Sequence, residues 1–443
     1  MSLPDIEGML RQAAMTHINL PRRISALLAA FVLMTSACTA FAAEVVGQKH
    51  FRFSGFATLG LTKGGDEDLG FHRDLDQEGL YDGDWSVSAD SLLGVQMDVV
   101  VNDQFGGAVQ MVGKDRVEDS LENSVEWAFL RYRFNPDWTV RAGRIGFDLF
   151  LLSDYRNVGF AYLWTRPPVE FYAPLTFTSF DGADLTWSTY AAGGMFRAKI
   201  SAGNTDSTLN ILDNQVNFEV HDIMTAAFSW ESERWQFKLS AVDTKVGAQG
   251  QYFPGSEPLA KNLQLALPIW PELVSVQDDI YLSNPHIYYY IFGVAYTRKP
   301  WQIQSEISRI DPRVNLYPET VQGYISAGYQ VNSLTPYFMV ARSESLGETR
   351  LVPEPPVIPS APELAAPLAA LQQGVQAIYD SLSSDQTTLT AGLRWDIRYD
   401  LALKVQLDHS RVGQRGLSLW EVRSAPMADK KINTFSINLN CIF

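Results

Sequence analysis

The residues of this sequence that could act together chemically are charged side chains at alternating positions. The stretch VEWAFLRYRFN places Arg131 and Arg133 two residues apart, and WTVRAGR adds Arg141 shortly afterwards. Side chains two residues apart on a strand point to the same side, so Arg131 and Arg133 share one face. Neighbouring arginines repel one another unless carboxylates or water balance them, which indicates that this row has a purpose.

Carboxylates in and beside the stretch from residue 148 to residue 184 supply the opposite charge. Opposite charges across a narrow passage of low dielectric constant create a transverse field, which orders water and favours polar, dipolar solutes. Each single charge can equally belong to a solvated wall. Lower-ranked candidates are Lys114, Arg156, Arg166, Arg197, Arg394 and Lys404. We predict that an aqueous passage is constricted by Arg52, Arg131, Arg133, Arg141, Asp148, Asp154, Glu170, Asp181 and Asp184.

Motifs for catalysis and metal binding are absent from the sequence. There is no Gly-x-Ser-x-Gly elbow and no phosphate-binding loop. After the first 42 residues the histidines are scattered without metal-ligand spacing; they are His50, His72, His221, His286 and His409. We therefore expect no bound metal, no cofactor and no enzymatic turnover.

Short runs of alternating apolar and polar residues are the elements that must position these charges. LLGVQMDVVVN, for example, puts Leu93, Val95 and Met97 on one face and Gln96 and Asp98 on the other. About sixteen such runs follow one another, joined by short and long links in alternation. The long links are residues 63–87, 116–123, 148–180, 205–219, 247–286, 310–318, 344–385 and 412–430.

This pattern predicts an all-β fold, an antiparallel transmembrane barrel of about sixteen strands with short periplasmic turns and long outer loops. No window of eighteen apolar residues follows the leader, as a spanning helix would require. The alternative is a large secreted β-sandwich. A sandwich would not need its short and long links to alternate so regularly.

The start of the chain has the pattern of a secretory signal peptide. Arg22 and Arg23 precede a short apolar run, and Ala40-Phe41-Ala42 forms a small-residue cleavage site. We predict a signal peptide over residues 1–42, with a possible true start at Met15, and a barrel domain over residues 43–443. Cys441 is then the only cysteine left, so no intrachain disulfide forms. The net charge of −15 argues against nucleic acid as a partner.

The chain ends in NTFSINLNCIF, which alternates up to its last residue. Phe435, Ile437, Leu439 and Cys441 fall on one face, and the chain stops at the aromatic Phe443. Chain ends usually fray into water, whereas lipid around a closed barrel demands one apolar face. We predict that this tail is the last strand and pairs with the first.

The leader, the strand count, the terminal Phe443 and the long third link together resemble the general bacterial porins. RAGRIG resembles the porin strand that leads into the infolded third loop, and Pro168-Val169-Glu170-Phe171 is an imperfect match to the Pro-Glu-Phe-Gly turn of that loop. Cys441 departs from the aromatic residue that the family often carries two places before its end. The resemblance covers residues 44–443 in architecture.

The resemblance implies a homotrimer in the outer membrane of a Gram-negative bacterium, in contact with its lipid. It implies passive diffusion of small hydrophilic solutes and ions through a water-filled channel. It also implies that the barrel assembly machinery reads the final strand, through Phe435, Ile437, Leu439 and Phe443.

The third long link is expected to fold into the lumen. Its apolar side chains include Leu149, Phe150 and Trp164, and a free surface loop would not expose so many. The alternative is contact with a neighbouring subunit. The link 344–385 predicts a proline-rich lead-in and an amphipathic helix, with apolar residues at Leu364, Leu368, Leu371, Val375 and Ile378 or Tyr379.

Two other functions stay open at this point. A substrate-selective channel, for a sugar or an organic acid, would use an aromatic track in the third link. That track would consist of Tyr155, Phe160, Tyr162, Trp164 and Phe171. A barrel enzyme, such as a lipase or protease, would need a Ser/His/acid cluster, and His409-Ser410 is the only adjacent pair. Ion selectivity also stays open, because net acidity and the inward bases point in opposite directions.

Overall fold

The computed structural model describes most of the chain beyond the leader. The described residues are 50–81, 85–116, 120–211, 214–247, 250–253, 256–283, 285–347, 350–423 and 428–443. The predicted signal peptide, residues 1–42, its cleavage site and the possible start at Met15 lie outside them. Among the described helices, none has the length and apolar character needed to cross a membrane.

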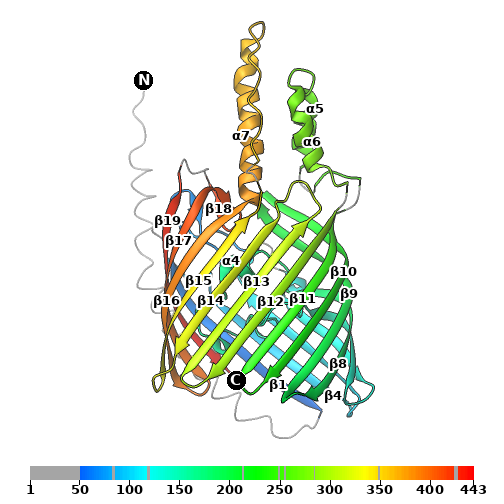
Figure 1. Ribbon diagram of the computed structural model, residues 1–443, viewed down its shortest axis with the longest axis vertical. Coiled ribbons are helices and arrows are strands. Elements are labelled where there is room, and N and C mark those ends of the chain that lie inside the picture. The colour runs from blue at the N-terminus through cyan, green and yellow to red at the C-terminus, as the bar shows by residue number, and fades with distance from the viewer. Residues whose placement is uncertain are drawn as a thin grey trace, which may run out of the picture. The chain divides into compact units, whose positions relative to one another are not determined.

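Sixteen long antiparallel strands form one closed barrel (Figure 1). The ring closes at β1, where Ala57 pairs with Leu93 of β4 on one side and with Cys441 of β19 on the other. The barrel strands are β1 (Phe51–Lys63), β4 (Leu92–Val100), β5 (Phe105–Lys114), β6 (Val125–Arg133), β7 (Trp138–Gly146), β8 (Ser179–Ala191), β9 (Gly194–Ile211), β10 (Asn214–Ser232), β11 (Trp235–Val246), β12 (His286–Arg298), β13 (Trp301–Pro312), β14 (Thr320–Tyr329), β15 (Leu334–Ser345), β16 (Ser384–Arg398), β17 (Leu401–Leu417) and β19 (Lys430–Ile442). The predicted fold class is confirmed, and so is the pairing of the last strand with the first.

Three short strands accompany the barrel. β3 (Trp85–Ser86) pairs with β1 near its end, and β2 (Leu69–Gly70) pairs with β18 (Glu421–Val422) in a separate two-stranded sheet. The β2–β18 pair joins the loop after β1 to the loop before β19, two segments far apart in the sequence.

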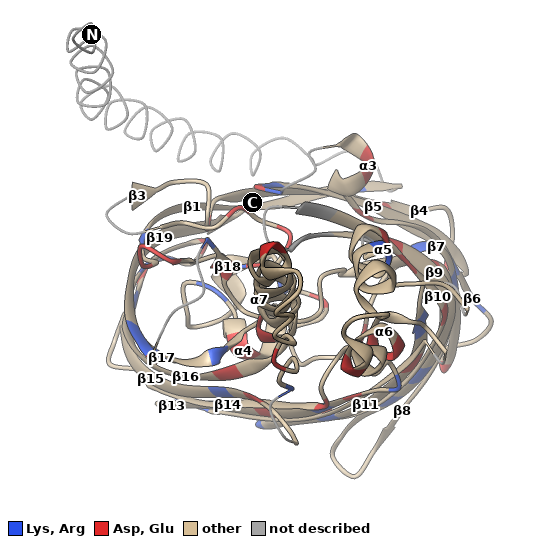
Figure 2. Cartoon of the chain, turned by 90° about the horizontal axis from the view of Figure 1, so that it is seen from above, with Lys and Arg blue, Asp and Glu red and all other residues tan. Residues whose placement is uncertain are grey.

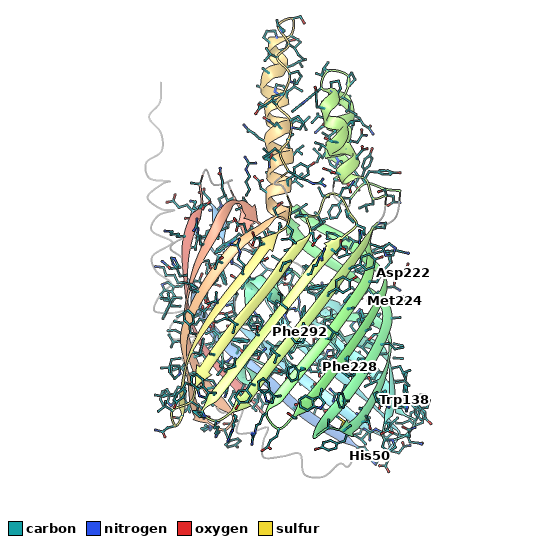
Figure 3. The ribbon with its side chains drawn as sticks, viewed as in Figure 1. His50, Trp138, Asp222, Met224, Phe228 and Phe292 are labelled. Carbon is teal, nitrogen blue, oxygen red and sulfur yellow. The ribbon has the colours of Figure 1, made fainter. Side chains whose placement is uncertain are left out.

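The alternation in the strands separates a lipid face from a lumen face. On β10 and β12 the outward Met224, Phe228 and Phe292 are 62%, 45% and 44% exposed, and Figure 3 shows them on the outer wall of the barrel. On β19 the inward Asn438 and Asn440 are fully buried inside the barrel. A strand with lipid on one side and filled lumen on the other requires this pattern.

One predicted link is wrong. Residues 205–219 are not a loop, because β9 runs to Ile211, β10 starts at Asn214, and Thr205 pairs with Val220. The stretch is rich in Thr, Asn and Asp, which we read as loop composition. Strands that extend beyond the lipid have water on both faces, so they form a ladder without apolar alternation.

Helices occur in the long loops and not in the wall. Leu368, Val375 and Tyr379 form the buried face of α7, which confirms the predicted amphipathic helix. Tyr379 Oη donates to Asp279 Oδ2 of α6 at 2.7 Å, and both helices project beyond the barrel at its long-loop end (Figure 1). The helices are α3 (Leu121–Ser124), η1 (Gly159–Ala161), α4 (Val169–Tyr172), α5 (Glu257–Ala266), η2 (Pro271–Leu273), α6 (Val274–Ile280), η3 (Pro362–Leu364) and α7 (Ala365–Leu382).

Candidate functional site

The loop between β7 and β8, residues 147–178, lies inside the barrel, and we name it L3. Its Phe150, Trp164 and Phe171 are 2%, 1% and 0% exposed, and they belong to one apolar cluster with inward side chains such as Tyr289 and Met339. Seen from the long-loop end, α4 of this loop lies within the barrel outline (Figure 2). The predicted infolding of the third loop is confirmed.

On the opposite side, L3 is held through its backbone. Lys404 Nζ of β17 donates to the carbonyl oxygens of Gly159, Tyr162 and Trp164 at 2.5, 2.6 and 2.6 Å. Arg394 of β16 donates to the Tyr162 carbonyl at 2.9 Å. A loop buried in a protein interior must find partners for its backbone carbonyls, and these two cations supply them.

Arg166 is the most enclosed charge of L3. Its guanidinium donates to Asp90 at 2.7 and 2.9 Å and to Asp408 at 3.1 Å, and it lies 4.8 Å from the centre of the Phe71 ring. The Arg166 side chain is 2% exposed. One arginine therefore joins L3 to the loop before β4, to β17 and to the loop after β1.

Asp74, in the loop after β1, gathers several bases. Its carboxylate lies 2.7 Å from Arg156 of L3, 3.0 Å from Lys114 and 3.7 Å from Arg73. Burial alone would raise the pKa of Asp74, but the charges of Lys114, Arg156 and Arg73 outweigh it and hold the pKa well below its usual range. The first outer loop is thereby tied to L3 by ionised groups.

Two glutamates complete the contacts of L3 with the wall. Glu306 of β13 accepts from the Leu151 backbone N–H at 2.8 Å and from Tyr172. Glu170 of α4 accepts from Gln386 at 2.6 Å and from Thr388. Burial raises the pKa of Glu170, and the bonds from Thr388 and Gln386 offset only part of that shift.

A polar space of about 890 Å³ lies at the long-loop end on the other side of L3, and we name it the outer vestibule. Its charged lining residues are the carboxylates Asp76, Glu122, Glu126, Asp181, Asp206, Glu219 and Glu257 and the bases Lys114, Arg116 and Arg144. Each base already contacts a carboxylate: Lys114–Asp76 at 3.4 Å, Arg116–Glu126 at 3.2 Å and Arg144–Asp181 at 3.0 Å. The remaining charge of the vestibule is negative.

No protein-family model matches this chain, and no curated protein matches its sequence. Solved structures do match. The outer membrane channel DcaP of Acinetobacter baumannii superposes with a TM-score of 0.51 at 11% identity, covering 89% of this chain and 97% of that one. OmpF of Salmonella typhi, in a complex with daunomycin, gives 0.50 at 13% identity, with 89% and 97% covered. OmpT of Vibrio cholerae gives 0.50 at 10% identity, with 90% and 100% covered.

The chain has the fold of a Gram-negative porin. Identities this low show the fold alone, and the resemblance read from the sequence is confirmed at that level.

Within this porin fold, the predicted constriction residues pair mainly with neighbours on adjacent strands. Arg141 Nε of β7 donates to Asp184 Oδ2 of β8 at 2.9 Å, and the Asp184 side chain is 1% exposed. Arg52 of β1 lies 3.2 Å from Asp98 of β4, near the short-turn end. These pairs run along the wall and do not reach across the lumen.

The other predicted members are dispersed. Asp148 contacts the ammonium groups of Lys199 and Lys238, and Glu170 faces β16 as described above. Asp181 pairs with Arg144 at the vestibule. Asp154 is exposed on L3, Arg131 is half-buried and Arg133 is exposed at the end of β6. The role of this set as a constriction stays a prediction.

Arg166, Arg394 and Lys404 were low-ranked candidates from the sequence, and Asp90, Asp408 and Glu306 were not among the candidates. One signal was available for Glu306. In WQIQSEISR it shares the inward face with Gln302 and Gln304, yet it alone carries a charge there. For Asp90, outside the long strands, no local pattern indicates its arginine partner.

Of the five aromatic residues of the predicted track, Tyr155 and Phe160 are half-buried and three are buried. Tyr162, Trp164 and Phe171 are 5%, 1% and 0% exposed, within the apolar cluster. His409 and Ser410 lie on opposite faces of β17. His409 is exposed beside Asn433 and Ser410 is buried beside Thr388. Over the part of the chain that the structure describes, no three His, Cys, Asp or Glu side chains gather as a metal site would require.

Proposed function

We propose that the chain is an outer-membrane channel of a Gram-negative bacterium, through which small hydrophilic solutes and ions diffuse passively without turnover chemistry. The observation that carries this proposal is the division of the lumen. L3 fills one side with an apolar cluster, and the other side holds the 890 Å³ vestibule lined by charged groups. Closed barrels of this size leave room for water where loops do not fill them.

A polar strip on the wall continues from the vestibule toward the short-turn end. Gln110 Nε2 donates to Gln96 Oε1 at 2.8 Å, Gln96 donates to Asp98 at 3.1 Å, and Asp98 pairs with Arg52. These residues face inward on β1, β4 and β5. We propose that hydrated solutes follow this strip and that Arg131, Arg133 and Arg141 with Asp184 narrow it.

Planar-bilayer recording of the purified, refolded protein tests the proposal. We expect ohmic conductance, stepwise insertion in threes for a homotrimer, and a cation-selective reversal potential in a salt gradient, because the vestibule carries more carboxylates than bases. A folded, heat-modifiable barrel that conducts no current would refute the open channel. Single insertion steps would refute the trimer alone.

We also propose the predicted processing and assembly of the chain. Residues 1–42 are removed on export, so the exported protein starts at Ala43 in an intact-mass measurement. Phe435, Ile437, Leu439 and Phe443 form the signal for the barrel assembly machinery, with the barrel then held by outer-membrane lipid. Phe443→Ala is expected to reduce the amount of heat-modifiable barrel in outer membranes, whereas Asn433→Ala, at an exposed position of β19, leaves it unchanged.

A substrate-selective channel is the second candidate. Three of the five residues of its predicted aromatic track, Tyr162, Trp164 and Phe171, are buried, which argues against sugar stacking on them. A different observation favours selectivity, namely an apolar cavity beside the vestibule. A barrel enzyme has less support, because His409 and Ser410 face opposite sides of the wall.

A further inference from the structure

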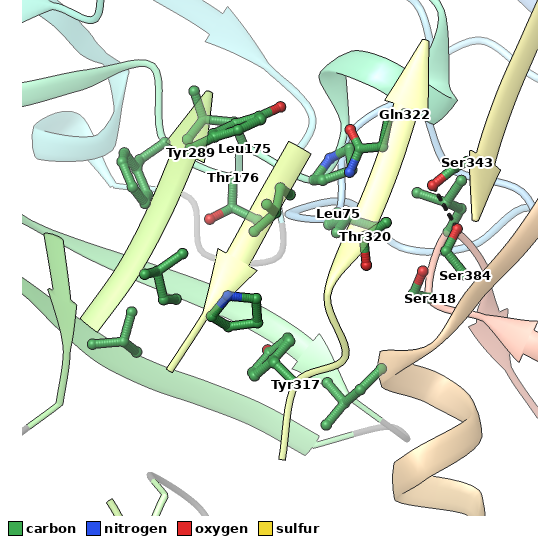
Figure 4. Close-up of a pocket in the computed structure, with 18 of the residues that line it drawn as sticks. Leu75, Leu175, Thr176, Tyr289, Tyr317, Thr320, Gln322, Ser343, Ser384 and Ser418 are labelled. Carbon is green, nitrogen blue, oxygen red and sulfur yellow. Dashed lines mark hydrogen bonds between the residues drawn. The ribbon is translucent and has the colours of Figure 1, made fainter. Parts of the chain in front are cut away.

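An apolar cavity of about 220 Å³ lies in the outer half of the lumen, between L3 and the inward faces of β10 to β14 (Figure 4). Its apolar wall residues on the strands include Val220, Val242, Ile287, Tyr289 and Ile310. L3 contributes Leu175 and Phe177, and the loop before β19 contributes Leu419 and Trp420. The strands, L3 and an outer loop together form the wall of one apolar cavity.

This lining is unusual for the interior of a water-filled barrel. Inward positions of such barrels are polar, because they face water. Val220, Ile223 and Val242 are at most 7% exposed, yet the loop side chains that pack over them leave space beside them. Apolar surface around a preformed space, with a few polar groups, is the usual chemistry of a small-molecule site.

One polar side chain of the lining has an unused acceptor. Gln322 of β14 is 2% exposed, and its Oε1 has no hydrogen-bond partner among the described residues. His72 Nδ1 and Nε2 and Tyr289 Oη of the lining also have no hydrogen-bond partner among the described residues, whereas several serine and threonine hydroxyl groups nearby are occupied. Ser384 donates to Ser343 at 2.7 Å, the dashed line in Figure 4, and Thr244 donates to the His221 carbonyl at 3.1 Å. A buried acceptor without a partner is destabilising, so a ligand that donates a hydrogen bond there is favoured.

The cavity is built for an uncharged ligand. Among the described residues, neither Lys nor Arg lines it, and Glu421 is its only carboxylate. His72 also lines it, and burial, only partly offset by nearby backbone groups and by Asp74, lowers the pKa of His72 to about 4, so it is neutral at pH 7. A cavity of about 150 Å³ holds benzene, so this one has room for a single ring with a short alkyl group.

We propose that this cavity binds a small uncharged compound with an apolar ring and one hydroxyl group, an alkylphenol in chemical class, whose O–H donates to Gln322 Oε1. The ligand would enter from the outer vestibule, since Thr176, Phe177 and Phe218 line both spaces. The site lies beside the polar passage and binds whether or not that passage conducts, so it goes beyond the proposed channel.

Calorimetric titration of the refolded barrel in detergent with 4-ethylphenol tests the inference. We expect saturable binding with one site per chain. Ile310→Trp fills the cavity and should abolish it. Ile307→Trp is the matched control, because Ile307 lies on the same strand but faces lipid and is 54% exposed. Val242→Phe is a second filling variant for use if Ile310→Trp fails to form a heat-modifiable barrel.

Gln322→Leu tests the hydroxyl group separately. It should weaken 4-ethylphenol about 2- to 10-fold, the value of one hydrogen bond, and leave ethylbenzene unweakened. Equal binding by the filled variants and by Ile307→Trp would mean partition into the micelle and would overturn the site. An unchanged preference for 4-ethylphenol in Gln322→Leu would overturn the hydroxyl contact. Binding in a barrel that conducts no ions would refute only the proposed channel.

Discussion

L3 touches two walls of the barrel that differ in chemistry. On β16, β17 and β19 it meets polar groups, such as Lys404, Gln406 and Asn438, that bond to its backbone. On β10 to β15 it meets mostly apolar groups, such as Ile223 and Met339, which belong to the same apolar cluster as its aromatic rings. Lys238, Ser240 and Glu306 also bond to its backbone on that side. L3 is therefore fixed by directional bonds on both sides, and on β10 to β15 the burial of its aromatic rings adds to them.

The polar wall, on β16, β17 and β19, and the apolar wall, on β10 to β15, contribute differently to the position and stability of L3. Hydrogen bonds and ion pairs depend on angle and distance, so the polar wall defines where the L3 backbone runs. Burial is non-directional, so the apolar cluster on β10 to β15 stabilises L3 without specifying each contact. It also leaves the cavity of about 220 Å³, whereas the inward Asn438 and Asn440 of the polar wall are fully buried.

The largest loss of unfolding free energy is expected from removing a charged contact between L3 and the polar wall. Arg166→Met leaves the carboxylates of Asp90 and Asp408 buried without their cation. Removing one partner of a buried pair costs about 3–5 kcal/mol. We expect that loss in the free energy of urea-induced unfolding, together with increased single-channel current noise as L3 moves.

Arg411→Met is the matched control for Arg166→Met. Its ion pair with Asp429 has a similar distance, 3.0 Å, but the side chains are 67% and 51% exposed. An exposed pair contributes about 0–1 kcal/mol. Equal losses in the two variants would contradict the role given to the polar wall.

A somewhat smaller loss of unfolding free energy is expected from removing an apolar contact of L3. Leu152 of L3 is fully buried in the apolar cluster, and Leu152→Ala should cost about 2–5 kcal/mol. Because the polar bonds still position the backbone, we expect unchanged channel current and noise. Leu265→Ala, on α5 and 71% exposed, is the control, with a change near zero. If Leu152→Ala made the channel as noisy as Arg166→Met does, the two walls would not differ in function.

The barrel was predictable from sequence because lipid demands a period of two. β4 shows it in full, with Leu93 and Val95 outside and Gln96 and Asp98 inside. Apolar alternation is not required where a strand extends beyond the lipid. The extensions of β9 and β10 lack it, and they were therefore interpreted as a loop. The apolar inward face could not be recognised from the sequence either, since in IYYYIFGVAYT apolar residues occupy both faces of β12.

The partners of the charges were not predictable. Asp148 was assigned to the passage, but it meets Lys199 and Lys238, which lie 51 and 90 residues away in the sequence. A charged residue in a loop carries no local sign of its partner, because loop path and strand register decide which groups meet. Infolding itself was predictable, since it follows from the apolar content of L3.

Acid should weaken the link between the first outer loop and L3. Because the folded-state pKa of Asp74 is depressed, its contribution is complete well above the unfolded value of about 3.9 and is lost as the pH falls below it. We expect the unfolding free energy of Asp74→Asn to lie below that of the original protein at pH 7 and to converge with it toward pH 3. Asp103→Asn, in an exposed turn, should show no such convergence. A gap that is independent of pH would show that the Asp74 charge is not what stabilises the link.

The smallest expected change is in ion selectivity, and it comes from the vestibule, the polar counterpart of the cavity. Asp206 is an exposed carboxylate of its lining, so Asp206→Asn should shift the reversal potential toward weaker cation selectivity by a few millivolts, without loss of stability. Glu363→Gln is the control, because η3 lies beyond the far end of α7, whose 18 residues span about 27 Å. That length exceeds the Debye length of about 10 Å at 0.1 M salt, so the control should leave the reversal potential unchanged. Equal shifts in both variants would mean that selectivity reflects the net charge of the whole outer surface and not the vestibule.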